Sequence, residues 1–153
     1  MLSVDFNKRV AAPWSLEQIK KVFRYIAKST GQSGEIEVNI VGDKEIRDLN
    51  FHYRGFDKPT DVLSFAWQED GIIKTSYLGQ IYICYPQIVR QATDLSIKPK
   101  EEFVRMLAHG FLHIIGHDHG KKKEAEIMFG LQEEIVENFF KGTKATKKIK
   151  KAH

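Results

Sequence analysis

Apolar and polar residues alternate in two short segments near the N-terminus. In residues 2–6 (LSVDF) and 35–41 (EIEVNIV), apolar side chains recur at every second position, the period of a β-strand with one covered face. Residues 15–30 instead repeat apolar side chains with helical spacing, and Ser15 with Gln18 forms the sequence signature of a capping box. This part of the chain is therefore predicted to fold as strand, helix and strand.

The middle of the chain predicts a short helix and two adjoining strands. Asp43 is expected to cap the helix, and the segment YRGFDKPTD, residues 53–61, to form a loop rich in Gly, Pro and charge. Residues 62–67 (VLSFAW) and 78–84 (LGQIYIC) are apolar enough for buried strands, with a polar connection between them.

Three further helices are predicted after the last strand. One begins at Pro86, one carries the apolar segment 103–115, and the last runs from about Lys122 to Phe140 with apolar residues at spacings of four. Helices alternate with two strands, whereas the other two strands adjoin. We therefore expect an α+β fold in a single domain, with a mixed sheet of about four strands packed with about five helices.

Length and composition fit one hydrophobic core. The chain has 153 residues, of which 42% are hydrophobic, enough for one domain and too few for two. The net charge of +4 comes from the end of the chain, because residues 141–153 hold six of the 24 Lys and Arg and no acid. We expect a domain of residues 1–140 and a basic, disordered tail of residues 141–153, which either stays solvated or attracts phosphates of any sequence.

Two absences indicate the cellular compartment. No apolar run of about eighteen residues is present, and charged residues interrupt the N-terminal segment that a signal peptide would need. Cys84 is the single cysteine, so no disulfide can form within the chain and no cysteine cluster can hold a metal. The interpretation is a protein of the cytoplasm, or of an equivalent reducing compartment, without membrane contact and with Cys84 as a buried thiol.

Four of the six histidines fall in the segment LAHGFLHIIGHDHG, residues 107–120. His109 and His113 are four positions apart on the predicted helix, so they project from one face, one turn apart. Gly116 can end that helix in a left-handed conformation, after which His119 approaches from the opposite side. Three neutral imidazoles suit zinc and leave a fourth position for water or substrate, as in catalytic sites. We predict one Zn²⁺ at these three histidines, with other divalent metals as alternatives.

Other positions of this segment fit a metalloenzyme less simply. His117 is two positions from His119 and is not expected to be a ligand. Asp118 either orients a liganding imidazole or caps a turn. Position 110 is Gly, where the zincin motif H-E-x-x-H of metalloproteases has its general base, so peptidase activity loses most of its mechanism. Histidines that are hydrogen-bonded singly, without metal, are the alternative to a metal site.

Three blocks of the chain resemble the YbeY family of ribosomal RNA maturation factors. HGFLHIIGHDH, residues 109–119, resembles the family pattern H-G-x-L-H-x-x-G-x-D-H. LNFHYRGFDKPTDVLSF, residues 49–65, resembles N-x-x-Y-R-x-x-D-x-P-T-D-V-L-S-F, and LGQIYIC, residues 78–84, resembles L-G-D-I-x-I-C. The departures are His117 where the family commonly has Tyr, Gln80 in place of a common acid, and Ala66 in place of a frequent proline.

The resemblance implies a zinc-dependent, single-strand-specific endoribonuclease, whose histidine ligands lie on a zincin-like helix. Its implied role is to mature ribosomal RNA, notably the 3′ end of the small-subunit RNA, and to serve ribosome quality control, with ribosomal RNA and the ribosome as partners. His109, His113 and His119 fall on the metal-ligand positions, and Arg54 falls on a functionally important arginine. Any ribosomal protein or GTPase partner, the oligomeric state, the cleavage site and the choice between water and the 2′-hydroxyl as nucleophile stay open.

Arg54 also has a chemical role without the resemblance. A guanidinium offers a planar fork to phosphate oxygens and stabilises charge that develops on phosphorus. The alternative is a surface ion pair with Asp57 or Asp61. Four nearby aromatic residues could stack on bases, although core packing is the favoured interpretation for most of them: Phe51, Tyr53, Phe56 and Trp67.

Two other functions remain to be weighed against RNA cleavage. One is hydrolysis of another substrate class, such as peptides, against which the missing Glu at position 110 counts. The other is a non-catalytic ribosome assembly factor with a structural metal, against which ligation by histidines alone with an open position counts. Turnover with and without a chelator separates these functions.

Overall fold

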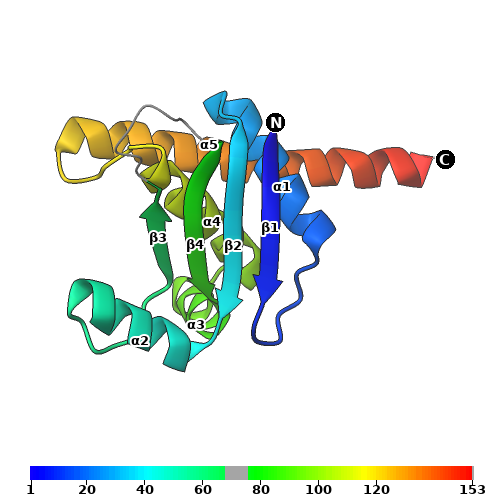
Figure 1. Ribbon diagram of the computed structural model, residues 1–153. Helices are drawn as coiled ribbons and strands as arrows, with labels where there is room; N and C mark the ends of the chain where they lie inside the picture. The colour runs from blue at the N-terminus through cyan, green and yellow to red at the C-terminus, as the bar shows by residue number, and fades with distance from the viewer. Residues whose placement is uncertain (68–75, 153) are drawn as a thin grey trace.

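A computed structural model describes residues 1–67 and 76–152, with side chains as far as Gly142. Its elements are β1 (Leu2–Lys8), α1 (Leu16–Thr30), β2 (Gly34–Val41), α2 (Asp43–Arg54), β3 (Val62–Ala66), β4 (Tyr77–Cys84), α3 (Tyr85–Leu95), α4 (Pro99–Ile114) and α5 (Lys122–Ala152). The strands form one sheet in the order β1-β2-β4-β3 (Figure 1). β1, β2 and β4 are parallel to one another, whereas β3 is antiparallel to β4. The predicted α+β fold with a mixed sheet is confirmed.

The sheet separates two hydrophobic clusters. Behind it in Figure 1, α1, α4 and α5 pack on the face that carries Val38 and Ile81 and form the main core. α2 covers part of the opposite face through a smaller cluster around Ile46 and Leu63. The sequence predicts one covered face for β2, but the structure covers both at its C-terminal end, where Asn39 is fully buried as well.

α4 lies at the centre of the main core, between the sheet and α5. Trp14 stacks on Phe103 with ring centroids 4.2 Å apart, and Phe23 meets Phe111 edge to face at 5.8 Å. Burial of each such side chain contributes roughly 1.5–3 kcal/mol. α4 is therefore a firmly held support for the side chains that it presents at its C-terminal end.

The N-terminus of α1 has the predicted capping box. The Ser15 hydroxyl accepts a hydrogen bond from the Gln18 N–H at 3.3 Å, and the Gln18 side chain accepts one from the Ser15 N–H at 2.8 Å. Gly31 ends the helix in the left-handed conformation, with φ 69°. The local sequence therefore sets both ends of this helix.

α2 differs from the prediction at both ends. Gly42 is the residue before its first turn, and Asp43 lies inside that turn, where its carboxylate accepts a hydrogen bond from Arg90 at 2.6 Å. A carboxylate in a first turn also interacts favourably with the helix dipole, so Asp43 needs no capping role. The helix continues to Arg54 and stops at Gly55, with φ 78°. Arg54 is therefore the last helical residue and not part of a loop.

α5 is longer than the sequence predicts. Its backbone is helical to Ala152, whereas the sequence predicts a helix that ends at Phe140 and a disordered tail. Lys and Ala favour helix and no proline follows Phe140, which accounts for the continuation. The division of the chain into a domain and a functionally separate basic tail stays a prediction. Neither α5 nor any other helix in the described residues combines the length and the apolar character needed to cross a membrane.

Candidate metal centre

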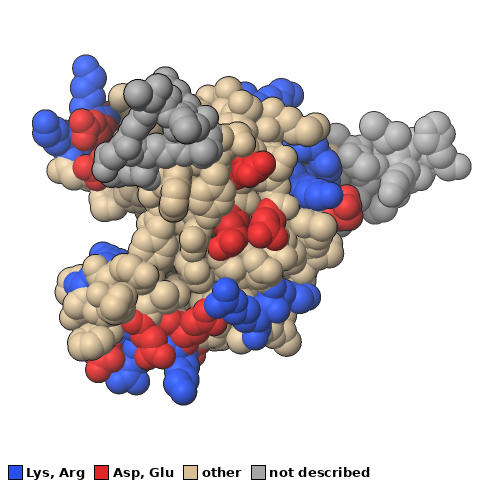
Figure 2. All heavy atoms as spheres, viewed as in Figure 1, with Lys and Arg blue, Asp and Glu red and all other residues tan. Residues whose placement is uncertain are grey.

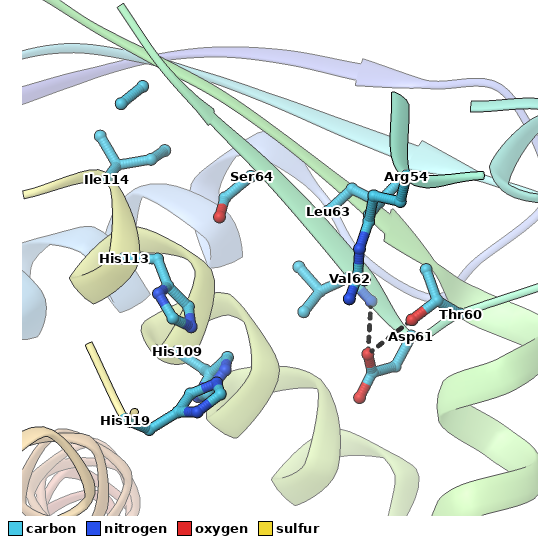
Figure 3. A pocket seen from close by; sticks show the side chains of 11 residues that line it. Arg54, Thr60, Asp61, Val62, Leu63, Ser64, His109, His113, Ile114 and His119 are labelled. Atoms are coloured by element: carbon cyan, nitrogen blue, oxygen red, sulfur yellow. Dashed lines mark hydrogen bonds between the residues drawn. The ribbon is translucent and has the colours of Figure 1, made fainter. Parts of the chain in front are cut away.

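A pocket of about 470 Å³ opens between the end of α2, strand β3 and the C-terminal end of α4. In the space-filling view it lies in the hollow between α2 below and the segment joining α4 to α5 above (Figure 2). Arg54 lines it from α2 and Asp61 from the residue before β3, while His109, His113 and His119 line it from α4 and the following turn (Figure 3). The structure thus brings the predicted ligands and the predicted arginine into one pocket.

A turn after α4 carries the third histidine back toward the first two. Gly116 has a φ of 102°, and its N–H donates to the carbonyl of His113 at 3.1 Å. The next N–H, of His117, donates to the carbonyl of Leu112 at 2.9 Å. This pair of bonds is a Schellman motif, and it reverses the chain so that His119 faces the helix it has just left. The predicted left-handed helix end at Gly116 is confirmed.

The three histidines (His109, His113 and His119) present ring nitrogens that all lie within 4.8 Å of one another. Ring centroids are 4.7 Å apart for His109 and His113, and 5.1 Å apart for His113 and His119. A tetrahedral zinc ion with Zn–N bonds of about 2.0–2.1 Å separates its nitrogens by about 3.3 Å, so modest ring rotations bring this set to ligand distance. No other His, Cys, Asp or Glu in the described residues joins the group. The donor set therefore fits zinc with a position left open.

Burial favours the protonation state that binds metal. Removal of the His113 ring from water lowers its pKa, and the neighbouring His109 and His119 lower it further by charge repulsion. The neutral form of the ring is the one that offers a lone pair to a metal ion. At neutral pH this imidazole is therefore ready to bind without losing a proton first.

Gln132, on α5, holds the ring of His109. Its side chain is almost fully buried, and its Oε1 lies 2.8 Å from Nδ1 of His109. The amide nitrogen of Gln132 donates to the carboxylate of Glu133 at 3.1 Å, and a carboxylate can only accept. The amide oxygen therefore faces His109 and accepts from Nδ1–H, which leaves the Nε2 lone pair of that ring for a metal.

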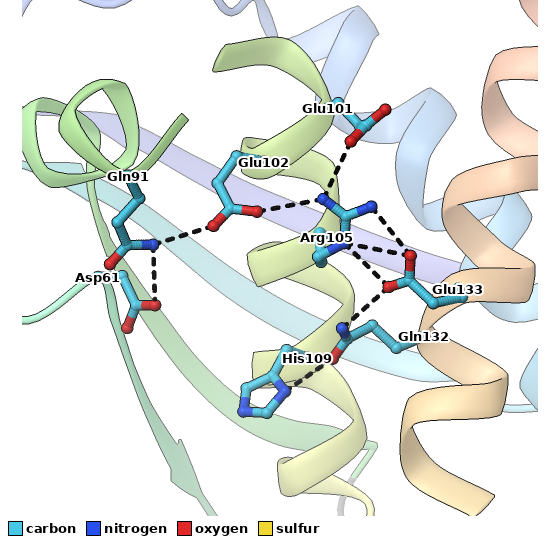
Figure 4. Close-up of polar contacts among 8 residues, drawn as sticks. All are labelled: Asp61, Gln91, Glu101, Glu102, Arg105, His109, Gln132 and Glu133. Carbon is cyan, nitrogen blue, oxygen red and sulfur yellow. Dashed lines mark hydrogen bonds and ion pairs between the residues drawn. The ribbon is translucent and has the colours of Figure 1, made fainter. Parts of the chain in front are cut away.

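Gln132 belongs to a chain of polar contacts that crosses the protein behind the pocket. Its members, in order, are His109, Gln132, Glu133, Arg105, Glu102, Gln91 and Asp61 (Figure 4). Arg105 makes two bonds of 2.9 Å to Glu133 and one of 3.2 Å to the buried Glu102. The hydrogen bonds that Arg105 donates to Glu133 and Glu102 raise the pKa of its guanidinium, so the cation is permanent. Glu133, which is itself held by Arg105, therefore restrains the amide of Gln132 on the side away from the pocket.

His117 and Asp118 do not join the histidine cluster. The carboxylate of Asp118 accepts hydrogen bonds from the backbone N–H groups of His119 and Gly120, at 2.7 Å and 3.2 Å. Of the two roles left open for Asp118, the structure shows the turn cap. The cap orders the backbone of His119, so Asp118 supports the third histidine through the main chain.

Gly110 faces the sheet rather than the pocket. A Cβ atom at this position would lie 3.2 Å from Cγ2 of Val62 and 3.4 Å from Cγ2 of Ile81. Glycine therefore lets α4 approach β3 and β4 closely. A glutamate here would enter the packed interface between helix and sheet, so the position that carries the base in the metalloprotease motif is sterically unsuited to one in this chain.

The guanidinium of Arg54 faces the pocket without a carboxylate partner among the described residues. Asp57 is bound instead by Arg47, with a bond of 2.7 Å. The Asp61 carboxylate accepts from the Val62 N–H at 2.7 Å and from the side chain of Gln91 at 3.3 Å. The alternative of a surface ion pair between Arg54 and either acid is therefore not realised, and the guanidinium is available to an anion.

The four aromatic residues near Arg54 are exposed, which corrects the interpretation that most of them pack in the core. Their exposed fractions range from 49% for Phe56 to 59% for Tyr53. Tyr53 touches Phe65 with ring centroids 4.8 Å apart, so it rests on the sheet at one edge only. The small cluster under α2 is built from Val41, Ile46, Leu63 and Cys84 with Phe65 and Tyr82 packed against it, and none of these four rings belongs to it.

Sequence reasoning missed Gln132 and a further aromatic residue, Phe129. A signal exists for Gln132, because helical spacing places it on the buried face of α5 between Met128 and Ile135. A lone polar residue in an apolar stripe must find a partner in the core. Phe129 lies outside that stripe and is 45% exposed, so its position in space becomes apparent only once α5 is packed against α4.

Comparison with known proteins identifies the family. A profile of the family described as Endoribonuclease YbeY matches residues 5–140. The chain belongs to the YbeY endoribonuclease family. A relative named Endoribonuclease YbeY from Malacoplasma penetrans is 35% identical over 132 residues, 85% of this chain and 88% of its own length. One of the same name from Persephonella marina is 41% identical over 134 residues, 86% of each chain.

A solved structure supports the same assignment at the level of the fold. The solution structure of a Thermotoga maritima protein has a TM-score of 0.66 and 28% sequence identity, and the match covers 95% of this chain and 93% of that one. The stretch that matches the YbeY family contains Arg54 and the three histidines. Of the departures from the family pattern, Ala66 lines the pocket, whereas the side chain of Gln80 accepts a hydrogen bond from Tyr82 at 2.9 Å, away from the pocket lining.

Proposed function

We propose that this chain is a metal-dependent endoribonuclease that cuts single-stranded RNA. The observation that carries the proposal is the meeting, in one pocket, of three imidazoles that fit one metal ion and a guanidinium that no carboxylate occupies in the described residues. The name shared by the relatives, Endoribonuclease YbeY, supports RNA as the substrate. Membership of this family favours RNA cleavage over hydrolysis of peptides and over a purely structural metal.

The three histidines are the proposed ligands of one Zn²⁺, with other divalent metals as alternatives. When bound, the ion supplies Lewis acidity and a means of activating water near neutral pH. The protein's own part is to hold the ligands: Gln132 fixes the tautomer of His109, burial keeps His113 neutral, and Asp118 orders the turn that carries the third ring.

Arg54 is proposed to bind the phosphodiester that is cleaved. Its guanidinium can donate two parallel hydrogen bonds to the oxygens of one phosphodiester, and in the pentavalent arrangement these oxygens carry more charge than in the substrate. The end of α2, fixed by the left-handed Gly55, places this side chain beside Val62 and Asp61, on the wall of the pocket opposite the three histidines (Figure 3). Arg54 therefore positions the phosphate and stabilises the charge that develops on it.

The proposed biological role is maturation of ribosomal RNA, notably the 3′ end of the small-subunit RNA, and ribosome quality control in the cytoplasm. The resemblance of the three sequence blocks supports this role, and RNA and the ribosome are the proposed partners. The face of the sheet opposite the main core bears acidic side chains (Figure 2), including those of the paired residues Asp5 and Glu37, and repels RNA phosphates. This charge distribution favours approach of RNA at the pocket.

A cleavage assay tests the proposal. Purified protein is analysed for metal and incubated with a single-stranded RNA and with the same RNA annealed to its complement. We expect one zinc per chain, cleavage of the single strand only, loss of cleavage after chelation and recovery on adding zinc. The His113→Ala variant should lose both metal and cleavage, whereas His117→Tyr, the matched control, should keep both.

Several outcomes would contradict the proposal. Cleavage that survives complete removal of metal would exclude metal-dependent chemistry, and cleavage of peptides in place of RNA would assign another substrate class. Full metal occupancy without any turnover would favour a structural metal. The ends of the RNA products identify the nucleophile: a 5′-phosphate with a free 3′-hydroxyl indicates water, and a 2′,3′-cyclic phosphate indicates the 2′-hydroxyl of the RNA.

A further inference from the structure

Two exposed phenylalanines lie next to residues that line the pocket, Phe56 next to Arg54 and Phe129 next to His109 and His119. Phe56 follows the end of α2 and is 49% exposed, and Phe129 lies on α5 and is 45% exposed. They belong to segments far apart in the sequence, and each contacts a different part of the candidate site. A single half-exposed apolar side chain is ordinary on a protein surface, so the contacts that each ring makes, and not its exposure, indicate a role.

Phe56 lies next to the phosphate-binding side of the pocket. The Cζ atom of Arg54 is 5.5 Å from the centre of its ring, and Nζ of Lys58 is also 5.5 Å from that centre. Two cations at this distance interact with the ring and surround it with positive charge. A nucleotide can stack its base on this ring while its phosphates are attracted by the two flanking cations. An uncharged protein surface would leave both cations without a partner in the complex.

Phe129 lies next to the metal-binding side of the pocket. Its ring is nearly parallel to that of His119, with an interplanar angle of 9° and centroids 6.3 Å apart. The ring of His109 lies at 6.4 Å and 20°. Neighbouring Met128 turns into the core, whereas Phe129 points away from the buried face of α5. Phe129 therefore lies on the solvent side of the histidine cluster, next to the rings of His109 and His119.

We propose that Phe56 and Phe129 are stacking platforms for the two bases on either side of the phosphate that the pocket holds. The proposal rests on the proposed function, because it takes RNA as the substrate. A strand whose phosphate lies between Arg54 and the three histidines has one flanking nucleotide on the side of Phe56 and the other on the side of Phe129. Since each platform needs the face of an unpaired base, the arrangement selects single strands over duplexes without reading sequence.

The test uses the zinc-loaded full chain and a single-stranded RNA oligonucleotide that the wild type cleaves at one mapped position. Phe56→Leu and Phe129→Leu keep an apolar side chain of similar size but remove the ring. We expect each to raise KM about tenfold, the loss typical of one stacked base, with unchanged zinc content. Leu95→Ala, which alters a more exposed apolar side chain at the end of α3, is the control and should keep the wild-type KM.

A second substrate identifies which base each ring holds. An oligonucleotide that lacks the base on one side of the cleaved phosphate should raise KM about tenfold for the wild type, and should cause no further loss in the variant whose ring held that base. The other variant should lose about tenfold again. This coupling distinguishes stacking from a general disturbance of the fold, which would add to the loss on every substrate.

Failure of this inference and failure of the proposed function give different results. If the wild type neither binds nor cleaves RNA, both are wrong. If the wild type cleaves RNA and both Leu variants keep its KM on intact and base-deleted substrates, only the stacking platforms are wrong. If the variants lose self-association in sedimentation while KM is unchanged, the rings belong to an interface between copies of the chain, and the proposal is likewise overturned.

Discussion

The ring of His109 on α4 donates its Nδ1–H to the side-chain oxygen of Gln132 on α5, over 2.8 Å. One ligand of the candidate metal centre is therefore positioned by two helices: α4 carries the ring and α5 carries its hydrogen-bond acceptor. The rotation and the tautomer of the ring are set by a residue that does not face the pocket, and that residue is held in turn by Glu133 and Arg105.

The first prediction concerns this contact. Gln132→Leu keeps the volume and helix propensity of the residue but removes the acceptor, so His109 can rotate and take its other tautomer. We expect zinc affinity to fall about 10- to 100-fold, the usual effect of removing a partner behind a liganding histidine. Competition with a coloured chelator measures it, and Glu134→Gln on the exposed face of α5 is the control. Equal affinities for the two variants would contradict the role of Gln132.

The second prediction concerns Arg54. We expect Arg54→Ala to retain metal and fold but to lower kcat/KM for RNA about a hundredfold or more, comparable to removal of one preorganised donor. Arg54→Lys should recover little, because a point charge does not replace the bidentate fork. Arg47→Ala is the matched control, since Arg47 lies on the same helix but is paired with Asp57. Parental rates for the metal-loaded Arg54→Ala protein would disprove the assignment.

The third prediction concerns Gly110. Gly110→Glu recreates the H-E-x-x-H motif, yet we expect no peptidase activity and a loss of more than about 3 kcal/mol in the free energy of unfolding, because the carboxylate would be forced between α4 and the sheet. Urea denaturation measures the loss. Gly130→Ala on α5, where a Cβ meets no atom within 4 Å, is the control and should stabilise by roughly 0.5–1 kcal/mol. A stable Gly110→Glu protein would contradict the close approach.

The fourth prediction concerns Cys84. Burial raises the pKa of its thiol from the usual 9.0 to about 11. Well below pH 9 the thiol is protonated in both folded and unfolded chains, and the shift has no effect on stability. Between pH 9 and about 11 the unfolded chain ionises first, so stability falls as pH rises through this window. At pH 8 about one thiol in a thousand is ionised in the folded protein. Labelling with iodoacetamide should therefore require denaturation, and rapid labelling of native protein would contradict the buried site.

The fifth prediction concerns the basic end of α5. Gly142 lies so close to the ring of Tyr25 that a Cβ atom there would collide with it, so a truncation that removes residues 143–153 preserves this contact. If the lysines beyond it recruit RNA, the shortened chain should bind all single strands more weakly and with a flatter dependence on salt, while kcat is unchanged. Identical salt slopes would show that these lysines are only solvated.

Local patterns in the sequence were sufficient to predict the helices and strands and part of the candidate metal centre. The spacing of His109 and His113 and the conformational freedom of Gly116 are properties of one helix and its end, so the cluster could be predicted before any tertiary contact was known. The capping box at Ser15 and the alternation in β2 are local in the same sense. These features depend on residues only a few positions apart.

The support of the site could not be predicted in this way, because it depends on helix packing. Gln132 and His109 are 23 positions apart, and they meet only because α5 crosses α4. Arg54 was expected in a loop, since Gly55 and Pro59 suggested one, and the helix ends two residues later than the pattern indicates. Phe56 and Phe129 resemble core residues by composition, and only the packed structure shows them beside the pocket.

The three histidines lie on backbone segments of unequal stability, and this difference affects the rate at which a metal ion would exchange. Two rings belong to a helix locked in the core, whereas His119 is exposed and depends on a surface turn held by two hydrogen bonds to Asp118. Opening that turn requires no unfolding of the core, so an incoming ion can meet two ligands first and gain the third when the turn closes. Metal exchange should accordingly proceed through the turn, at a rate set by its local opening rather than by global unfolding of the protein.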